Sequence, residues 1–164
     1  MILAGESERV ASYVASRIRH QEAFITGYEA LGAIDSDGRL IGGFVYSELR
    51  MCPGGGSIAV CAAGERGWLS RGNLKVFLGE YPFGLLKVHR IQATVAKSNR
   101  RARNVIERLG FKNEGTLRGG LGVGKDAIVY GLLREESLWL GDVDPCSLSD
   151  NPGYRVPGNA IASR

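Results

Sequence analysis

The segment best suited to bind an anion is a glycine-containing loop that follows an apolar, strand-like run over residues 57–63. The loop includes Gly67 and Gly72, and Asn73 after it is a suitable cap for a helix. Backbone amides at the beginning of a helix lack partners and attract anions such as phosphate. The loop contains neither G-x-x-x-x-G-K-S/T nor G-x-G-x-x-G, which excludes a P-loop and a dinucleotide fingerprint. The pattern predicts either another type of phosphate site or an ordinary connection in which Trp68 packs on the core.

Residues that commonly hold metals or form disulfides are few. The three cysteines, Cys52, Cys61 and Cys146, are an odd number without paired spacing, so we expect reduced thiols. Only two histidines accompany them, which leaves little material for a metal site. Cys61 has no visible histidine partner, so a buried thiol is expected there and not a catalytic one. We therefore predict a protein that uses no metal.

Length and composition fit a single globular domain. The chain has 164 residues, of which 44% are hydrophobic and 23% charged, as is usual for proteins with one packed core. We expect this domain to span residues 1–140, followed by an irregular tail at 141–164 that is rich in Asp, Pro, Ser, Asn and Gly. The sequence has no apolar run of roughly 20 residues and no secretory signal pattern. These features predict a cytoplasmic protein without membrane contact.

The net charge is mildly basic. Lysine plus arginine minus aspartate plus glutamate is 21 − 17 = +4, which favours a phosphorylated small molecule but falls short of a nucleic-acid signature. Several arginines gather at 100–108, without the interleaved aromatic residues that nucleic-acid binding would need. A basic nucleic-acid-binding domain is therefore the least favoured function, and we expect no nucleic-acid partner.

Apolar periodicity and turn residues predict helices and strands that alternate in the middle of the chain. The predicted helices are 7–19 with Ser7 as a candidate cap, a segment from Asn73 to Pro82, and one that begins after Ser98 or Asn99 and ends at Gly110. The predicted strands are 28–34, 40–49, 57–63, 88–96, 111–116 and 126–134. Alternation favours parallel pairing in the middle, and hairpins favour antiparallel flanks. We expect an α/β (α+β) fold with a mixed, mostly antiparallel sheet and helices on both faces.

Five short motifs follow one another within residues 58–136. They are Lys87-Val88-His89-Arg90-Ile91, Ser98-Asn99 with Ala102, Glu107-Arg108-Leu109-Gly110-Phe111, Glu114-Gly115-Thr116-Leu117-Arg118, and Asp126 with Tyr130-Gly131-Leu132-Leu133-Arg134-Glu135-Glu136. In order and spacing they resemble the GNAT superfamily of acyl-CoA-dependent N-acetyltransferases, and within it the ribosomal-protein N-terminal acetyltransferases. The resemblance implies that the fourth and fifth strands run parallel and splay apart. It also implies that acetyl-CoA enters this opening, with its pyrophosphate on the loop before the second helix.

The resemblance also implies which residues hold acetyl-CoA. They are Ala62, Arg66, Gly67, Trp68, Leu69, Ser70, Arg71, Gly72, Asn73, Asn99 and Arg103. The loop pattern of the family, Q/R-x-x-G-x-G/A, is matched at Arg66, whereas Leu69 replaces the glycine and Arg71 the small residue. Backbone amides do not depend on side-chain identity, so the predicted location of the phosphate site is unchanged. Arg66 or Arg71 could add a charged contact to phosphate.

Acid–base chemistry depends on other positions. Many superfamily members have a tyrosine as general acid where this chain has Ile106, and Tyr130 is a candidate replacement although strand tyrosines usually serve packing. An alkylammonium, with a pKa of about 10.4, must lose a proton before it can attack a thioester. An α-amine, whose pKa is about 8, needs little help. Glu48 and Glu65 are the candidate bases. Because Glu65 lies near the phosphates that it would repel, we predict Glu48 as the catalytic base.

The expected function is the transfer of an acetyl group from acetyl-CoA directly to a primary amine in a ternary complex, with the carbonyl polarised by a strand amide. The acceptor, a small molecule or a protein N-terminus, is not identified, because acceptor pockets are built from variable loops. The alternative is a non-catalytic acyl-CoA-binding or protein-interaction module on the same fold, which the altered loop and the missing tyrosine would allow. A homodimer is compatible with either function.

Overall fold

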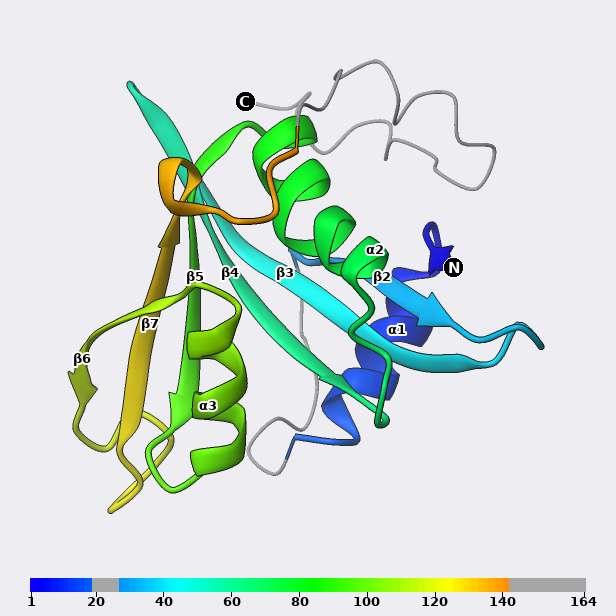
Figure 1. Cartoon of the computed structure of the whole chain (residues 1–164). Helices are drawn as coiled ribbons and strands as arrows, with labels where there is room; N and C mark the ends of the chain where they lie inside the picture. The colour runs from blue at the N-terminus through cyan, green and yellow to red at the C-terminus, as the bar shows by residue number, and fades with distance from the viewer. Residues whose placement is uncertain (19–26, 142–164) are drawn as a thin grey trace.

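The chain is organised around one seven-stranded sheet. The computed structural model describes residues 1–18 and 27–141, and Figure 1 shows their arrangement. The described strands are β1 (Ile2–Leu3), β2 (Glu29–Ile34), β3 (Leu40–Cys52), β4 (Gly55–Gly64), β5 (Val88–Ala96), β6 (Lys112–Leu117) and β7 (Ala127–Leu133). The described helices are α1 (Ser7–Ala15), α2 (Arg71–Lys75), the π-helix η1 (Val76–Leu85), α3 (Arg100–Arg108) and the 3-10 helix η2 (Arg134–Glu136).

The order of the strands across the sheet is β1-β2-β3-β4-β5-β7-β6. Only β4 and β5 pair in parallel, and all the other neighbouring strands described are antiparallel. Helix α1 packs on one face of the sheet, whereas α2, η1 and α3 lie on the other (Figure 1). The predicted mixed sheet with helices on both faces and one parallel pair in the middle is therefore confirmed.

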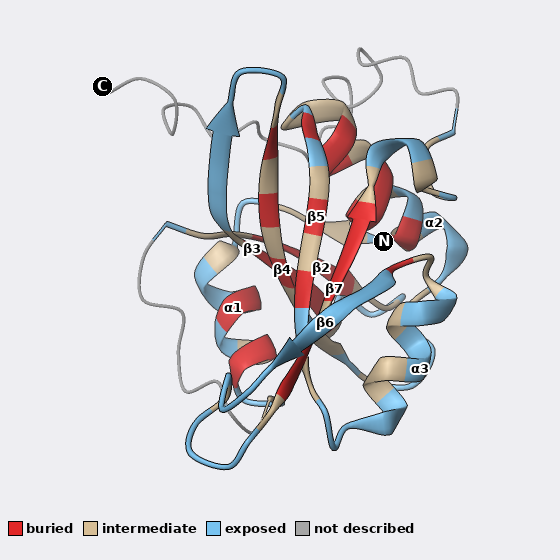
Figure 2. Ribbon diagram, turned by 90° about the vertical axis from the view of Figure 1, so that its left-hand side faces the viewer, coloured by how far each residue is buried: buried red, intermediate tan, exposed pale blue. Residues whose placement is uncertain are grey.

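Burial differs strongly between the middle of the sheet and its β6 edge. The strands in the middle are lined with buried residues, whereas β6 at the edge is exposed along its whole length (Figure 2). The main core lies between the sheet and η1, and it includes Phe44, Tyr46, Phe77 and Tyr130. A smaller core lies between α1 and strands β2 to β4.

Helix α1 is held to the sheet by apolar contacts and by Ser7. Val10 and Val14 are fully buried against the sheet. The prediction that Ser7 caps the helix is wrong, because the N-cap is Glu6 and no side chain caps it. Ser7 Oγ donates instead to the Glu29 carboxylate at 2.9 Å and accepts the amide of Ala30 at 3.1 Å. The hydroxyl thus joins α1 to β2, and the helix ends at Ala15, inside the predicted range.

The second helix begins and ends differently from the prediction. Ser70 is the N-cap, and its Oγ accepts the amide of Asn73 at 3.1 Å, so Asn73 is not the cap. The helix also does not end at Pro82, because it continues as the π-helix η1 as far as Leu85. In a π-helix each amide donates five residues back, so the missing Pro82 amide leaves the carbonyl of Phe77 free. The buried Tyr46 hydroxyl donates to this carbonyl at 2.8 Å, which explains why the proline is tolerated.

The third helix confirms its predicted ends. Asn99 Oδ1 accepts the amide of Ala102 at 3.1 Å, which makes Asn99 the N-cap of α3. The helix stops before Gly110, whose φ of 98° is readily adopted only by glycine. Strand β5 before this helix has the predicted bounds, 88–96.

After η2 the chain returns to the helical face. The indole N–H of Trp139 donates to the carbonyl of Leu109 at 2.8 Å, beyond the end of α3. The backbone of Trp139 passes so close to Gly79 that a Cβ atom there would overlap its carbonyl. The segment up to Leu140 is therefore packed on the domain, and the predicted tail at 141–164, apart from Gly141, lies outside the described residues.

Candidate active site

The parallel pair in the middle of the sheet separates part of the way along. Gly56–Ala59 of β4 pair with Val88–Gln92 of β5, and beyond these residues the two strands are no longer paired with each other. They start side by side and diverge toward their C-terminal ends (Figure 1). The opening forms part of a cleft of about 1920 Å³ that is also lined by residues of β3, α3, β7 and the end of α1. The predicted splay of these two strands is thus present.

The loop between β4 and α2 forms one wall of the cleft and is held by Trp68. The indole is 8% exposed and packs against Phe44 and Phe77. It also lies so close to Gly42 and Gly64 that a Cβ atom at either glycine would overlap the ring. The interpretation that Trp68 packs on the core is therefore confirmed. The Trp68 anchor and the Ser70 cap therefore fix the second half of the loop in a defined shape.

The residues predicted to hold acetyl-CoA fall into two groups. Those that line the cleft are Ala62, Arg66, Gly67, Trp68, Leu69 and Asn99. Those outside the described lining are Ser70, Arg71, Gly72, Asn73 and Arg103. The first four of these lie at the cap and in the first turn of α2, next to the loop. The guanidinium of Arg103 donates to the Tyr130 hydroxyl at 3.3 Å and to the carbonyl of Lys97 at 3.2 Å.

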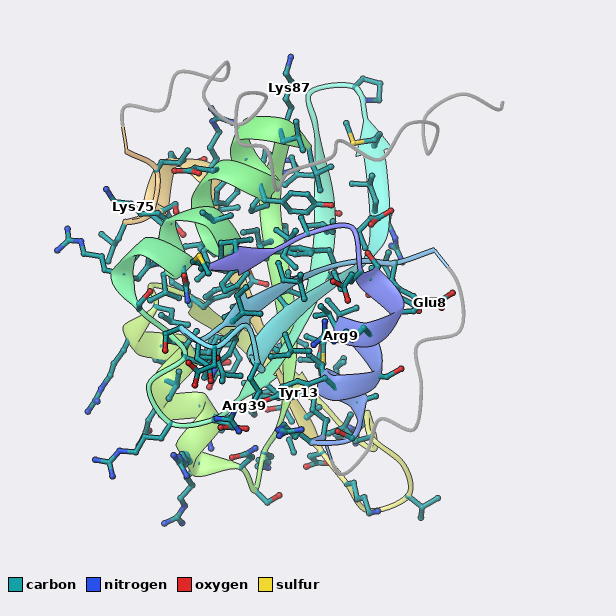
Figure 3. All side chains as sticks on the ribbon, turned by 90° about the vertical axis from the view of Figure 1, so that its right-hand side faces the viewer. Glu8, Arg9, Tyr13, Arg39, Lys75 and Lys87 are labelled. Carbon is teal, nitrogen blue, oxygen red and sulfur yellow. The ribbon has the colours of Figure 1, made fainter. Side chains whose placement is uncertain are left out.

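Glu65, at the beginning of the loop, takes part in an ionic network. Its carboxylate accepts from Arg17, just beyond the end of α1, at 3.5 Å and from Arg39 of the β2–β3 hairpin at 3.1 Å. Tyr13 and Arg39 lie on the same side of the molecule (Figure 3), and the Arg17 guanidinium stacks 3.7 Å above the Tyr13 ring. The Glu65 amide also donates to the carbonyl of Ile41 at 2.8 Å. Two arginines thus offset the charge that would otherwise oppose a phosphate nearby.

Glu48 lies on the cleft at an irregular point of β3. Strand β3 pairs Ser47 with Ala59 and then Arg50 with Ser57, so one extra residue forms a β-bulge. At this bulge Glu48 has φ 53°, a conformation that side-chain-bearing residues rarely adopt and that costs about 1–3 kcal/mol. Its carboxylate is 59% exposed and lies 3.7 Å from the Arg50 guanidinium. The strained conformation makes Glu48 a candidate functional residue, because strained residues concentrate at functional sites.

The candidate acid and nucleophile positions are also resolved. Ile106 lines the cleft at the position where the family has a tyrosine. Tyr130 is fully buried and donates its hydroxyl to Glu107 at 2.8 Å, and it is not among the described lining residues. Cys61 lines the cleft, and burial raises the pKa of its thiol to about 11, so the thiol stays protonated at neutral pH. Tyr130 therefore has a packing role, and Cys61 is a poor nucleophile.

Some cleft residues were not found from the sequence. They are Arg17, Ile18, Tyr28, Ser47, Gln92, Thr94, Leu117, Leu121 and Val129. The alternation in 88–96 indicated a strand with two different faces, and this signal could have singled out Gln92 and Thr94. The others come from strands, turns and the segment after α1 that lie far apart in the sequence, and only the tertiary fold brings them together.

Two searches of the described residues gave negative results. In residues 1–18 and 27–141, no group of three or more His, Cys, Asp or Glu side chains is arranged to hold a metal ion. None of the helices described is long and apolar enough to cross a membrane.

Comparison with known proteins gave matches among solved structures only. Neither a family model nor a curated protein matches the sequence. A mutant form of the spermidine N-acetyltransferase SpeG from Vibrio cholerae aligns with a TM-score of 0.65 at 18% identity, over 88% of this chain and 98% of that one. Ribosomal-protein-S5-alanine acetyltransferase from Vibrio fischeri aligns with a TM-score of 0.56 at 20% identity, over 67% of this chain and 63% of that one.

At these identities the comparison establishes the fold. The chain has the α/β fold of the GNAT acetyltransferases, with the parallel, splayed β4–β5 pair at its centre. Its structural neighbours are acetyltransferases that act on different amines, by their names a polyamine in one case and a ribosomal protein in the other. The resemblance inferred from the sequence motifs is thus confirmed at the level of the fold.

Proposed function

We propose that this protein transfers the acetyl group of acetyl-CoA to a primary amine. The observation that carries the proposal is the opened sheet, which gives one cleft with two different ends. At one end lies the loop between β4 and α2, and at the other lies Glu48 on its strained bulge. The part of β4 that no longer pairs with β5 thus lies between a candidate site for an anionic cofactor and a candidate base.

The loop end suits the phosphates of acetyl-CoA. The loop around Gly67 leads directly into the first turn of α2, and backbone amides before and at the start of a helix bind anions. Arg66 lines the cleft on the same side and supplies a positive charge. Around Ala62, β4 pairs with β3 but no longer with β5, so its free side is available to hydrogen-bond an extended arm that enters between the strands. Asn99, at the start of α3, faces the cleft from the other side.

Glu48 serves as the base at the other end. The acceptor arrives as an ammonium, and it must release a proton before its nitrogen has a lone pair. Glu48, directly or through a water molecule, removes this proton. The nitrogen then forms a bond to the carbonyl carbon while a β4 amide stabilises the negative charge on the oxygen. The C–S bond breaks, and the leaving thiolate takes up, through water, the second proton that the nitrogen loses as the amide forms.

The size of the cleft favours direct transfer. Pockets for one drug-sized ligand usually measure about 300–1,000 Å³, whereas this cleft measures about 1920 Å³, so two substrates fit together. An acetylated Cys61 intermediate is disfavoured because burial keeps that thiol protonated.

The test combines a binding and a turnover measurement on the full chain. Acetyl-CoA at 100 times its Kd should stabilise the protein by about 2.7 kcal/mol and raise its melting temperature. With a library of primary amines, free CoA thiol should appear together with an acetylated amine of equal amount. No melting shift at millimolar acetyl-CoA would overturn the proposal. A shift without thiol release for any amine would support the non-catalytic acyl-CoA-binding module.

A further inference from the structure

The cleft has a separate acceptor half on the α1 face of the sheet. The register places Ser47, Ala59 and Gln92 in one row across β3, β4 and β5. In the same way Thr94 pairs with Val129, and Leu117 pairs with Ala127. Side chains of paired residues lie on one face, and this face is opposite to that of Ile58 and Ile91 in the main core. This half of the cleft is therefore distinct from the half under α3.

Beside Arg17, the acceptor half has several apolar side chains in its walls. Leu117, Leu121 and Val129 line it from the β6–β7 hairpin, and Ile18 lines it from the end of α1. Leu117 is 48% exposed, and Ile18, Leu121 and Val129 are half-buried. Apolar side chains that line a cleft together suit an apolar ligand. The uncharged Gln92 and Thr94 lie between the two walls.

The segment that presents Leu121 is fixed. The Asp126 carboxylate accepts the amide of Gly119 at 3.1 Å and the Lys97 ammonium at 3.3 Å. The amide of Leu121 donates to the carbonyl of Lys125 at 3.0 Å. These bonds close the turn between β6 and β7 on itself, so Leu121 is held toward the cleft.

Charge limits the acceptor further. The described lining contains two carboxylates, Glu48 and Glu65, and Glu65 is already paired with Arg17 and Arg39. Glu48 has only the longer, exposed contact with Arg50, so it is the carboxylate left for a cationic acceptor in this part of the structure. One carboxylate matches one ammonium, and a second ammonium would enter the apolar part of the cleft without a partner.

From the apolar side chains of the walls and the one carboxylate that the described lining leaves available, we propose that the acceptor is a small primary monoamine whose nitrogen is attached to an apolar group. The inference rests on the proposed function and narrows its substrate class. It differs from the polyamine named for several of the structural neighbours.

The first test compares amines of graded size and charge. Each methylene that is buried contributes roughly a fourfold gain in binding, so kcat/KM should rise at least about tenfold from ethylamine to hexylamine. 1,4-Diaminobutane should be at least about tenfold poorer than butylamine, because its second ammonium must lose water without gaining a partner. Equal values along the alkyl series, or a preference for the diamine, would overturn the inference and leave acetyl transfer intact.

The second test uses matched variants of one turn. Leu121→Ser should lower the ratio of kcat/KM for hexylamine over ethylamine severalfold without a change in KM for acetyl-CoA. Val123→Ser is the control, because Val123 lies in the same turn, is fully exposed and is outside the described lining. This control should keep the ratio of the parent protein. An unchanged ratio in Leu121→Ser, or an equal fall in both variants, would overturn the inference.

A third measurement separates the inference from the proposed function. If acetyl-CoA binds and no amine is acetylated, calorimetric titration of hexylamine and ethylamine into the protein saturated with CoA reports acceptor preference without turnover. Tighter binding of hexylamine would then support the apolar acceptor half while acetyl transfer fails. Equal affinities would overturn the inference as well.

Discussion

Glu48 combines a strained backbone with a carboxylate on the cleft, and this combination makes its role testable. Glu48→Gln keeps the shape of the side chain and removes the base. We expect kcat/KM to fall by about 10²- to 10⁴-fold at neutral pH, the usual effect of losing a general base. The loss should shrink as the pH rises toward about 10.4, because the free amine then needs no base. The pH–rate profiles of both proteins check this, and parallel profiles would exclude Glu48 as the base.

Glu48→Gly separates strain from chemistry. Glycine adopts a φ of 53° readily, so the strain of about 1–3 kcal/mol is relieved, partly offset by the entropy that a more flexible unfolded chain gains. We expect the free energy of unfolding to rise by about 1 kcal/mol and the melting temperature by about 2–4 °C. The loss of activity should equal that of Glu48→Gln. A stable but inactive variant would show that the strain is kept for function, whereas a lower melting temperature would show that the bulge stores none.

Arg66 and Arg71 offer a second comparison at the scale of single residues. Arg66 lines the cleft, and Arg71 is the first residue of α2. We expect Arg66→Ala to raise the Kd for acetyl-CoA by about tenfold, as for a lost charged hydrogen bond, and to flatten its dependence on salt. Arg71→Ala should have the smaller effect. Lys75→Ala, on the same helix, is the control (Figure 3), and an effect of Lys75→Ala as large as that of Arg66→Ala would show that only overall charge matters.

At the scale of elements, η1 depends on a contact with β3. The carbonyl of Phe77 lacks the Pro82 amide and accepts the Tyr46 hydroxyl in its place. Tyr46→Phe leaves this buried carbonyl without a donor, so the free energy of unfolding should fall by about 1–3 kcal/mol. In the Tyr46→Phe background, Pro82→Ala restores an amide and should recover part of the loss. A double-mutant cycle from thermal or urea unfolding measures this coupling, and strictly additive effects would contradict it.

The same elements show what sequence patterns can and cannot predict. Strand β5 and the Asn99 and Gly110 ends of α3 were predicted correctly, because alternation, a cap and a left-handed glycine are local signals. The passage of η1 through Pro82 was not predicted, because a tyrosine about 36 positions earlier in the chain compensates for it. The apolar side chains on the cleft were missed for a similar reason, since only the tertiary fold brings Leu121 of the β6–β7 turn and Ile18 after α1 to one cleft.

At the scale of the whole molecule, the two layers of helices divide the cleft into its two halves. Helix α1 covers one face and helices α2, η1 and α3 the other, and the splay of β4 and β5 connects the faces between them (Figure 1). The loop between β4 and α2 begins at Glu65, whose carboxylate forms ion pairs with Arg17 after α1 and with Arg39 of the β2–β3 hairpin. The loop is thus braced by elements of the opposite face, so the geometry of both ends depends on the same fold.

The extent of the folded unit gives the last prediction. Trp139 donates to Leu109 and packs over Gly79, which joins the end of the described chain to both α3 and η1. A protein that ends at Leu140 should therefore keep the melting temperature and acetyl-CoA affinity of the full chain. One that ends at Glu136 loses Trp139, and we expect a cost of at least about 2 kcal/mol, or a melting temperature lower by about 4 °C or more.

Thermal unfolding and gel filtration of these two shortened proteins and of the full chain check this boundary. Gly79→Ala in the full chain is the matched point variant, because the added methyl group meets the Trp139 backbone and should mimic part of the loss. If the protein ending at Leu140 aggregates or melts well below the full chain, residues 141–164 belong to the folded domain, and the boundary predicted from their composition is wrong. If the protein ending at Glu136 melts like the full chain, the return of the chain to α3 contributes nothing to stability.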